Sequence, residues 1–461
     1  MQKTKKRAVS VLLSVLLLTA LFVAIPMTAL AASGSYDIVS SKDVSDLRTE
    51  IQVLTNGMGP GDVLTVTGSK TDADAVLGIS IPDGATVVWK AVYSDEDAGS
   101  FGSSYLFSIA GSGVFEVAED AKISASSAGV PALYVSQSAS IRVTGGEVAA
   151  NGTSDGSNAI RSQGTGSIEV SGGTVSSVNY RGITSESSGN VTVSGGTVSS
   201  ASTTFPTISA TSGNITVSGG GTVQSTGSVA IINYFGNVTV SGGTITAATT
   251  AISAEAGVLA VSGGTITSGA SCVSTQTGAI EVTGGELVGN GTSTAVGVYS
   301  TGTAKITGGT VDNVLTAIYV NSGGVAAYLT GTCETGTFIV GASGGMIIEV
   351  DALVIPASWD GDDIGLWWIA GGGTAIWDLS GATPIIAFIL TDESTPSITW
   401  GSKEASNPPN GGSGGSSSSS SSTTAVPKTG DNTNMLSWGI ALAVSVMGIV
   451  SLPIAKKKMS K

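Results

Sequence analysis

Histidine is absent from this chain of 461 residues, and cysteine occurs only twice, at Cys272 and Cys333. The missing histidine excludes Ser-His-Asp and Cys-His catalysis, histidine general bases and His-ligated metal centres. Two cysteines cannot build a zinc cluster or a disulfide scaffold. The sequence therefore predicts no catalytic residues of these kinds, no cofactor and no metal site.

Charge is also scarce, because only 11% of the residues are charged while 41% are apolar. A disordered chain needs the opposite balance, so disorder of the whole protein is excluded. The 66 glycines follow no three-residue period, which excludes collagen. A formal net charge of −14 argues against nucleic acid as a partner.

The first 31 residues have the pattern of a secretory signal peptide. Lys3, Lys5, Lys6 and Arg7 precede an apolar run over residues 8–25, and Ala29 and Ala31 supply small residues before the expected cut. We therefore expect cleavage after Ala31 and secretion of the remaining chain. The alternative is a retained N-terminal anchor.

A second apolar run, residues 435–455, lies near the other end of the chain. Its 21 residues carry no charge and would span about 31 Å as a helix, enough to cross a bilayer. Lys456, Lys457 and Lys458 follow directly and predict a cytoplasmic end. Residues 435–455 are therefore a predicted transmembrane helix.

Residues 426–430 read Val426-Pro427-Lys428-Thr429-Gly430 and stand just before this run. Pentapeptide, apolar span and basic tail together (residues 426–461) resemble the cell-wall sorting signal of Gram-positive bacteria, whose pattern is Leu-Pro-x-Thr-Gly. The chain departs from that pattern at Val426. The resemblance implies that sortase cuts after Thr429 and joins the Thr429 carbonyl to peptidoglycan, so that the membrane span is transient. The alternative is a plain membrane anchor.

Paired glycines recur through the middle of the chain at intervals of 21 to 27 residues, which is the signature of a solenoid. The first members of the pairs are Gly145, Gly172, Gly195, Gly219, Gly242, Gly263, Gly284 and Gly308. Alternating apolar residues flank each pair, and another apolar site lies about eight residues upstream. This pattern predicts three short strands per repeat, with glycine corners between them. Asn190, Asn214 and Asn237 share one phase, and we interpret them as structural.

The repeat resembles the right-handed parallel β-helix of pectin-lyase-like proteins. The resemblance is one of architecture, and it places no catalytic residue in this chain. We expect an all-β rod of nine to eleven turns over residues 59–333, about 45–50 Å long at the usual strand spacing.

The predicted rod is flanked by other segments. Residues 32–58 are expected to hold a linker and a capping helix over 43–55, with Val44, Leu47, Ile51 and Leu54 on its buried face, Ser41 as N-cap and Gly57 as its stop. Residues 334–400 contain five tryptophans and predict a C-terminal cap or small β domain. Residues 401–425 are a predicted disordered Gly/Ser-rich linker.

A polysaccharide-cleaving enzyme needs clustered carboxylates, usually beside a basic residue. Glu169 and Glu281 share an outward column but lie five turns apart, and Glu147 and Glu286 lie six turns apart. The basic residues are interpreted as similarly scattered: Arg142, Arg161, Arg181 and Lys305. We therefore predict no enzyme; the alternative is a wall-attached polysaccharide lyase or glycoside hydrolase.

Outward columns rich in threonine resemble those of ice-binding proteins, but threonine is also a favoured exposed strand residue. Exposed tryptophan can contact sugar rings, which makes Trp367 and Trp368 candidate glycan-binding residues. The sequence thus predicts a wall-anchored surface rod for adhesion, glycan or polymer binding, or surface structure, with sortase, peptidoglycan and an extracellular glycan or partner surface as partners.

The two cysteines fall at different phases of the repeat and three turns apart, too far for a disulfide. We therefore expect two free thiols, or one that contacts another molecule, with Cys272 pointing outward or into a loop because inward Val273 follows it.

Overall fold

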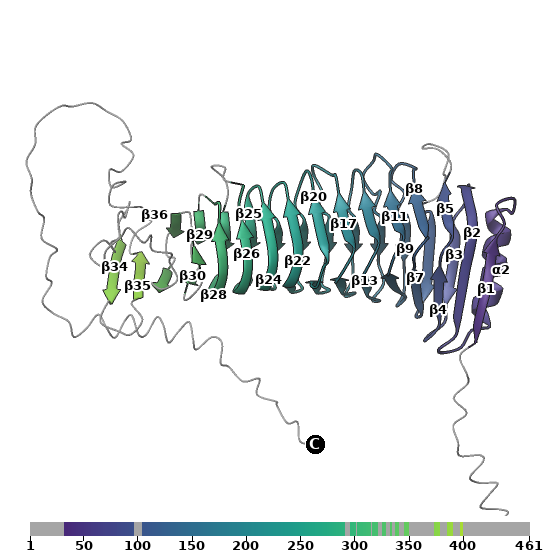
Figure 1. The fold of residues 1–461 in the computed structure, drawn as a ribbon, viewed down its shortest axis with the longest axis horizontal. Coiled ribbons are helices and arrows are strands. Elements are labelled where there is room, and N and C mark those ends of the chain that lie inside the picture. Colours follow the sequence, from purple (N-terminus) through teal and green to yellow (C-terminus); the bar gives the residue numbers. More distant parts are fainter. Residues whose placement is uncertain are drawn as a thin grey trace, which may run out of the picture.

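The computed structural model describes residues 32–95, 104–290, 296–300, 302–314 and 316–320, and beyond these only the strand backbone of short segments between residues 325 and 399. The chain forms a straight parallel β-solenoid of about ten turns, with helix α2 at one end (Figure 1). This architecture confirms the predicted all-β solenoid.

Two sheets wrap the rod, and each turn adds strands to both. Sheet A contains β1 (Ser33–Ile38), β2 (Val63–Ala73), β4 (Thr86–Trp89), β5 (Val92–Asp95), β7 (Val114–Val117), β8 (Lys122–Ala125), β10 (Ser140–Val143), β11 (Glu147–Ala150), β13 (Ile168–Val170), β14 (Thr174–Ser177), β16 (Val191–Val193), β17 (Thr197–Ser200), β19 (Ile215–Val217), β20 (Thr222–Ser225), β22 (Val238–Ala247), β24 (Val258–Ser268), β26 (Ala279–Val288), β28 (Thr303–Asp312), β30 (Val325–Tyr328), β31 (Thr332–Cys333), β33 (Gly345–Glu349), β34 (Gly373–Asp378) and β35 (Ile385–Leu390). Sheet B contains β3 (Leu77–Ile81), β6 (Phe107–Gly111), β9 (Leu133–Val135), β12 (Ile160–Ser162), β15 (Ile183–Ser185), β18 (Ile208–Ala210), β21 (Ile231–Asn233), β23 (Ile252–Ala254), β25 (Ser271–Thr275), β27 (Val296–Ser300), β29 (Thr316–Val320), β32 (Thr337–Val340) and β36 (Ser397–Thr399). Strands of successive turns pair in parallel up to β33, whereas β34, β35 and β36 pair antiparallel.

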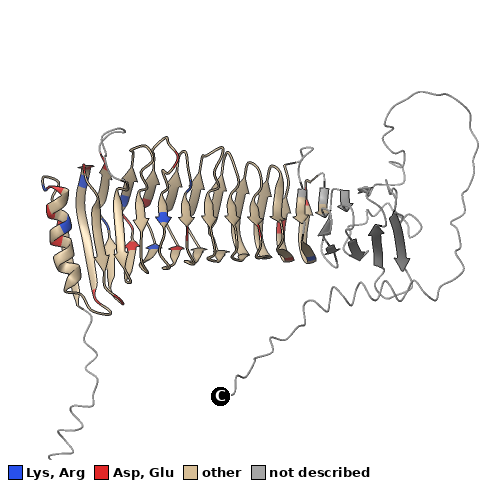
Figure 2. Cartoon of the chain, turned by 180° about the vertical axis from the view of Figure 1, so that it is seen from behind, with Lys and Arg blue, Asp and Glu red and all other residues tan. Residues whose placement is uncertain are grey.

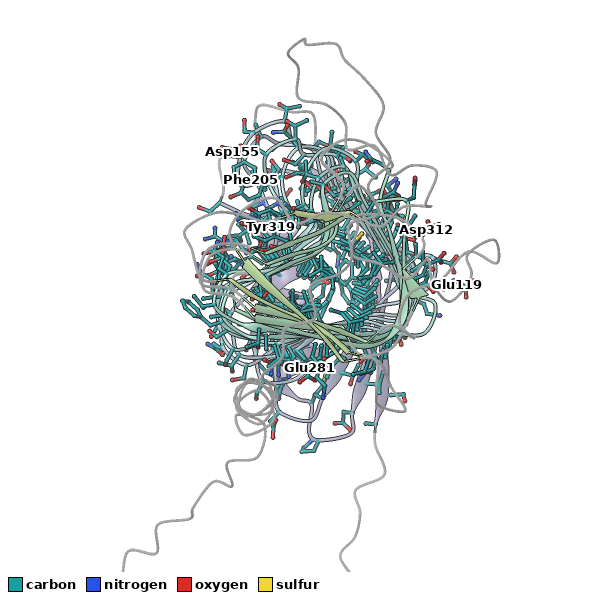
Figure 3. The ribbon with its side chains drawn as sticks, turned by 90° about the vertical axis from the view of Figure 1, so that its left-hand side faces the viewer. Glu119, Asp155, Phe205, Glu281, Asp312 and Tyr319 are labelled. Atoms are coloured by element: carbon teal, nitrogen blue, oxygen red, sulfur yellow. The ribbon has the colours of Figure 1, made fainter. Side chains whose placement is uncertain are left out.

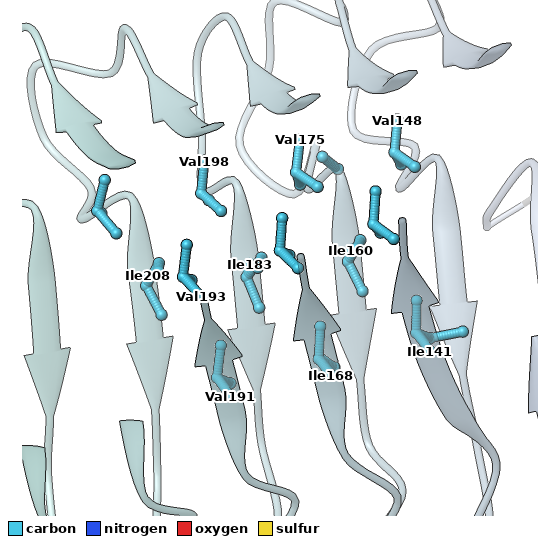
Figure 4. Packing of buried hydrophobic residues seen from close by; sticks show 14 of the residues in the cluster. Ile141, Val148, Ile160, Ile168, Val175, Ile183, Val191, Val193, Val198 and Ile208 are labelled. Atoms are coloured by element: carbon cyan, nitrogen blue, oxygen red, sulfur yellow. The ribbon is translucent and has the colours of Figure 1, made fainter. Parts of the chain in front are cut away.

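Inward columns of β-branched residues form the core. Ile141 pairs with Ile168, and Ile168 pairs with Val191, so that equivalent side chains stack from turn to turn (Figure 4). All three are at most 1% exposed. The apolar side chains of one turn are shielded from water only by those of the neighbouring turns. A single turn would therefore not be stable, and the repeat continues over many turns.

The paired glycines turn the chain inside sheet A. Gly173 and Gly196 have φ values of 66° and 64°, a conformation that only glycine adopts without strain. A Cβ on Gly173 would lie 2.4 Å from the carbonyl oxygen of Gly145 in the preceding turn. The structure therefore confirms that these glycines form the predicted corners.

The asparagine column links successive turns. Asn190 Oδ1 accepts the backbone N–H of Asn214 at 2.9 Å, and Asn214 Oδ1 accepts that of Asn237 at 3.0 Å. Asn237 Oδ1 accepts the N–H of Val258 at 2.9 Å. The structural role of the three asparagines is confirmed, and each side chain bonds to the backbone of the following turn.

Helix α2 (Val44–Asn56) covers the first turn and ends at Gly57, as predicted. Two details of the prediction are wrong. Asp43, not Ser41, is the N-cap residue, because the helix starts later than expected. Leu54 is 41% exposed while Thr55 is fully buried, since Thr55 follows Ile51 at i+4 and its hydroxyl is satisfied by the carbonyl oxygen of Gln52.

The predicted outward position of Cys272 is also wrong, because its side chain is fully buried. The chain turns a corner as it enters β25, so two consecutive residues, Cys272 and Val273, face the core. In earlier turns the equivalent positions hold Ala251 and Ala230, which are equally buried. Period-2 alternation fails at this corner.

Candidate functional site

The outward columns of sheet A are mostly hydroxyl side chains. The predicted register is confirmed, since Thr174, Thr197, Thr222, Thr244 and Thr265 pair in succession. The two predicted carboxylate separations also hold, because five pairings join Glu169 to Glu281 and six join Glu147 to Glu286. Figure 2 shows charged positions sparse along the middle of the rod and denser toward its helical end.

One charged group on sheet A departs from the prediction that the basic residues are scattered. Arg142 lies between Glu116 and Glu169 on three successive turns. Its Nη1 is 3.4 Å from Glu116 Oε2, and its Nε is 3.6 Å from Glu169 Oε2. Beside this group, Lys122 Nζ lies 3.2 Å from Glu147 Oε2. A sequence signal for this group existed, because Glu116, Arg142 and Glu169 are spaced by 26 and 27 residues. This spacing continues the repeat to positions before the first glycine pair.

Sheet B presents a different outer face, which holds the cluster that we call the Arg–aromatic patch. It is formed by Tyr134, Arg161, Gln163, Tyr180, Arg181, Glu186 and Phe205. Tyr134 and Arg161 occupy neighbouring positions of one outward column. Gln163 and Glu186 follow β12 and β15 directly, and the other three residues come from loops that lead into sheet B.

Glu186 joins the polar part of the patch. Its carboxylate accepts hydrogen bonds from Arg161 Nε at 2.7 Å, Arg161 Nη2 at 3.3 Å and Gln163 Nε2 at 2.7 Å. The Tyr134 hydroxyl in turn donates to Gln163 Oε1 at 2.5 Å. Burial by itself raises the pKa of Glu186, but the hydrogen bonds from Arg161 and Gln163 and the charges of Arg161 and Arg181 outweigh it, so the pKa lies below its usual value.

Arg181 anchors the aromatic part. Its guanidinium carbon lies 4.7 Å from the Tyr180 ring centre and 5.1 Å from that of Phe205, and Nη1 donates to the Tyr180 hydroxyl at 3.0 Å. The two ring centres are 4.2 Å apart. Cation–π contacts of this kind hold a planar cation and two rings in one arrangement. Arg181 Nε is buried and has no hydrogen-bond partner among the described residues.

Small residues line the sheet next to these side chains. Thr184 and Ser209 follow Arg161 in the outward column but are only 5% and 6% exposed. The Thr184 hydroxyl donates to Asn158 Oδ1 at 2.7 Å. Viewed along the rod, Phe205 lies on the same side as Tyr319 of sheet B, whereas Glu281 of sheet A lies on the opposite side (Figure 3). The patch therefore belongs to one face of the rod.

The site residues predicted from the sequence lie elsewhere. Val426, Pro427, Lys428, Thr429 and Gly430, the signal-peptide residues Ala29 and Ala31, and the two candidate glycan contacts Trp367 and Trp368 are all outside the described residues. The patch was not predicted, and the prediction that Arg161 and Arg181 are scattered is wrong, because loops that lead into sheet B bring Arg181 close enough for both charges to act on Glu186. Within the described part of the chain, no three Cys, Asp or Glu side chains are grouped as metal ligands, and no helix is long and apolar enough to cross a membrane.

The patch combines ring faces, paired hydrogen-bond donors and a carboxylate in one partly exposed surface, groups that can stack on a ligand and hydrogen-bond to it. Comparisons with protein-family models, with curated proteins and with solved structures found no match.

Proposed function

We propose that the chain is a secreted surface protein of a Gram-positive cell wall, which displays the solenoid as a glycan-binding rod without catalysis. In this proposal residues 1–31 direct export, Thr429 is joined to peptidoglycan by sortase, and the linker over residues 401–425 separates the rod from the wall. The turns of the rod are right-handed, as crossovers between parallel strands almost always are.

The observation that supports glycan binding is the Arg–aromatic patch. Aromatic rings offer apolar faces to the C–H groups of a sugar, while the fork of Arg161 and the Glu186 carboxylate can share hydrogen bonds with neighbouring hydroxyls. The ion pair between Arg161 and Glu186 already fixes both side chains in the free protein, so little side-chain entropy is lost on binding. Two arginines and one carboxylate give the patch a formal charge of +1, which favours a neutral or weakly acidic sugar.

The Glu116–Arg142–Glu169 group favours a second candidate function, polysaccharide cleavage. Two carboxylates beside a cation on successive turns are the residue types that a lyase or hydrolase uses. We prefer binding because Arg142 pairs with both carboxylates, which leaves neither one as an evident proton donor or acceptor.

Wall attachment is tested by fractionation of cells that express Thr429→Ala. We expect the wild type to be released by muramidase and the variant to stay in the membrane fraction, while Thr424→Ala in the linker behaves as wild type. Full extraction of the wild type by detergent alone would contradict the sorting proposal.

Glycan binding is tested with the full-length chain in mild detergent on a glycan array. We expect binding that falls at least tenfold in Glu186→Gln and not in Glu281→Gln, the same substitution on the opposite face. Equal loss in both variants, or loss only in Trp367→Ala or Trp368→Ala, would remove the patch as the binding site.

A further inference from the structure

Ala32, the residue that follows the expected signal-peptide cut, already belongs to the solenoid. Its carbonyl oxygen accepts the backbone N–H of Val63 at 2.9 Å. β1 starts at the next residue and pairs in parallel with β2, from Ser33 with Val63 to Ile38 with Gly68. A cut after Ala31 therefore places the new N-terminus directly at the first turn of the rod.

The carboxylate of Asp62 faces the nitrogen that this cut would free. The Ala32 N–H donates to Asp62 Oδ1 at an N–O distance of 2.6 Å, and the Gly59 N–H donates to Asp62 Oδ2 at 2.8 Å. The hydrogen bond from Gly59, and after it the one from Ala32, holds the pKa of Asp62 below its usual value. Asp62 is therefore ionised at neutral pH and directed at the Ala32 nitrogen.

Backbone hydrogen bonds on both sides fix the position of Asp62. Its N–H donates to the carbonyl oxygen of Gly59 at 3.0 Å, and its own carbonyl oxygen accepts the N–H of Thr86 in the next turn at 2.9 Å. The preceding residue, Gly61, has a φ of 89° and donates its N–H to the carbonyl oxygen of Gly84 at 2.8 Å. The carboxylate is therefore held in place before a positively charged group arrives at the Ala32 nitrogen, so little entropy is lost in binding it.

Asp62 carries a negative charge without a cationic side chain beside it. Within the part of the chain that the structure describes, six ion pairs join Lys or Arg to Asp or Glu, and none of them includes Asp62. Its two carboxylate oxygens accept from neutral backbone N–H groups. A positive charge on the Ala32 nitrogen would supply the partner that is missing from this carboxylate.

We propose that Asp62 binds the α-ammonium group that cleavage after Ala31 creates on Ala32, so that removal of the signal peptide completes the first turn of the solenoid. Hydrolysis of the Ala31–Ala32 amide by water leaves a carboxylate on Ala31 and, at neutral pH, an ammonium group on Ala32. The nitrogen keeps Asp62 as its partner, and a neutral hydrogen bond becomes a charge-assisted one, which is roughly twice as strong. The inference rests on the proposed export and on its cut after Ala31.

This ion pair would secure the beginning of β1, which stands with α2 at one end of the rod (Figure 1). The later part of β1 is already held to α2, because the Tyr36 hydroxyl donates to Glu50 Oε2 at 2.5 Å and Lys42 pairs with the same carboxylate. Chain termini fray unless they are tied down. Because exposed ion pairs add little to the overall free energy of unfolding, we expect the effect of Asp62 to be local to the new terminus.

The test uses the exported chain, collected with muramidase and mild detergent together so that it does not depend on wall attachment. Mass spectrometry of the N-terminal peptide should identify Ala32 as the first residue. The same peptide reports how fast the α-amine is acetylated by an N-hydroxysuccinimide ester at pH 7, a reaction of the neutral amine only. We expect acetylation to be about three- to tenfold slower in the wild type than in Asp62→Asn, because the carboxylate stabilises the ammonium form.

The controls separate the effect of charge from that of shielding. Asp83→Asn removes the same charge from the corner of the next turn, where Asp83 is exposed, and should react like the wild type. At pH 10, above the ordinary pKa of an α-amino group, the wild type and Asp62→Asn should react equally fast. Unfolding in denaturant at pH 7 should also abolish the difference. Circular dichroism checks the fold of each variant, and if Asp62→Asn does not fold, native and unfolded wild type are compared at both pH values instead.

Equal rates in the wild type and Asp62→Asn at pH 7 would overturn the ion pair, and so would a difference that persists at pH 10, because shielding would then explain it. Either result with Ala32 as the first residue leaves the proposed export intact. A first residue other than Ala32 would overturn both the expected cut and this inference. Wall attachment through Thr429 and glycan binding are measured separately.

Discussion

Arg161 and Glu186 form a forked ion pair across neighbouring turns, with Nε 2.7 Å from Oε1 and Nη2 3.3 Å from Oε2. The two residues are 25 positions apart in the sequence, and the solenoid brings them together because β12 pairs with β15. About one third of each side chain is exposed, so the pair is held firmly and can still be reached by a ligand.

The lowered pKa of Glu186 predicts how binding depends on pH. The ionised Glu186 carboxylate stabilises the folded patch. This contribution is fully present above the pKa of about 4.5 that the group has in the unfolded chain, and it is lost as the pH falls through the lower pKa of the folded protein. We expect glycan affinity to stay constant from pH 7 to about 5 and to fall only at more acidic pH. Titration calorimetry across this range measures it.

The Glu186→Gln variant provides the matched control for that titration, since it lacks the titrating group but keeps the shape. Its weaker affinity should not depend on this ionisation between pH 3 and 7. If the affinity of the variant falls at acidic pH in the same way as that of the wild type, the pH dependence belongs to another group.

The glycine corners predict opposite outcomes for two neighbouring substitutions. A Cβ on Gly196 would lie 2.6 Å from the carbonyl oxygen of Gly173, at a φ of +64°, whereas a Cβ on Gly220 would meet no atom within 4 Å. We expect Gly196→Ala to lower the free energy of unfolding by about 1–3 kcal/mol, and Gly220→Ala to change it by less than about 0.5 kcal/mol.

Chemical denaturation followed by circular dichroism compares the two variants with the wild type. Equal stability of Gly196→Ala and Gly220→Ala would contradict the corner geometry, because both replace glycine by the same residue.

The sequence pattern predicted those features of the structure that recur in every turn, namely the inward columns and the glycine corners. Inward residues such as Ile168 and Val191 recur at a constant phase beside the glycine pairs, and stacking leaves them only one register. The patch could not be predicted in the same way, because Tyr180, Arg181 and Phe205 lie in loops of unequal length that have no fixed phase. Their contacts depend on how each loop folds back over sheet B.

The charged group on sheet A lies between these two cases. Glu116, Arg142 and Glu169 keep the phase of the repeat, but Glu116 precedes the first glycine pair and so falls outside the motif that defines the register. If the apolar alternation is extended backward by one turn, from Ile141 and Val143 to Val114–Val117, Glu116 falls directly beside Arg142.

The same group yields a prediction about catalysis. Because Arg142 pairs with both carboxylates, we expect no reducing-sugar release and no unsaturated product from pectins, alginates, glycosaminoglycans or neutral glycans, with or without Ca²⁺. Turnover that disappears in both Glu116→Gln and Glu169→Gln but persists in Glu281→Gln would establish the second candidate function.

The last prediction concerns the thiols. Burial raises the pKa of Cys272 to about 11, although the Ser268 hydroxyl, 3.5 Å from Sγ, acts in the opposite direction. Since the thiolate is the reactive form, Cys272 should not react with a thiol reagent at pH 8 while the protein is folded. The Cys333→Ala variant isolates this residue, and its single thiol should become countable only after unfolding.

The register gives the expected count for the wild type. Cys333 pairs with Val311 in sheet A, three turns beyond Ile266, whereas Cys272 enters sheet B. Three turns alone correspond to about 14 Å along the rod, and a disulfide needs Cα atoms within about 7 Å. Unfolded, unreduced wild type should therefore titrate as two thiols per chain. A count of zero at monomeric mass would show that the two cysteines meet, which this stacking order does not allow.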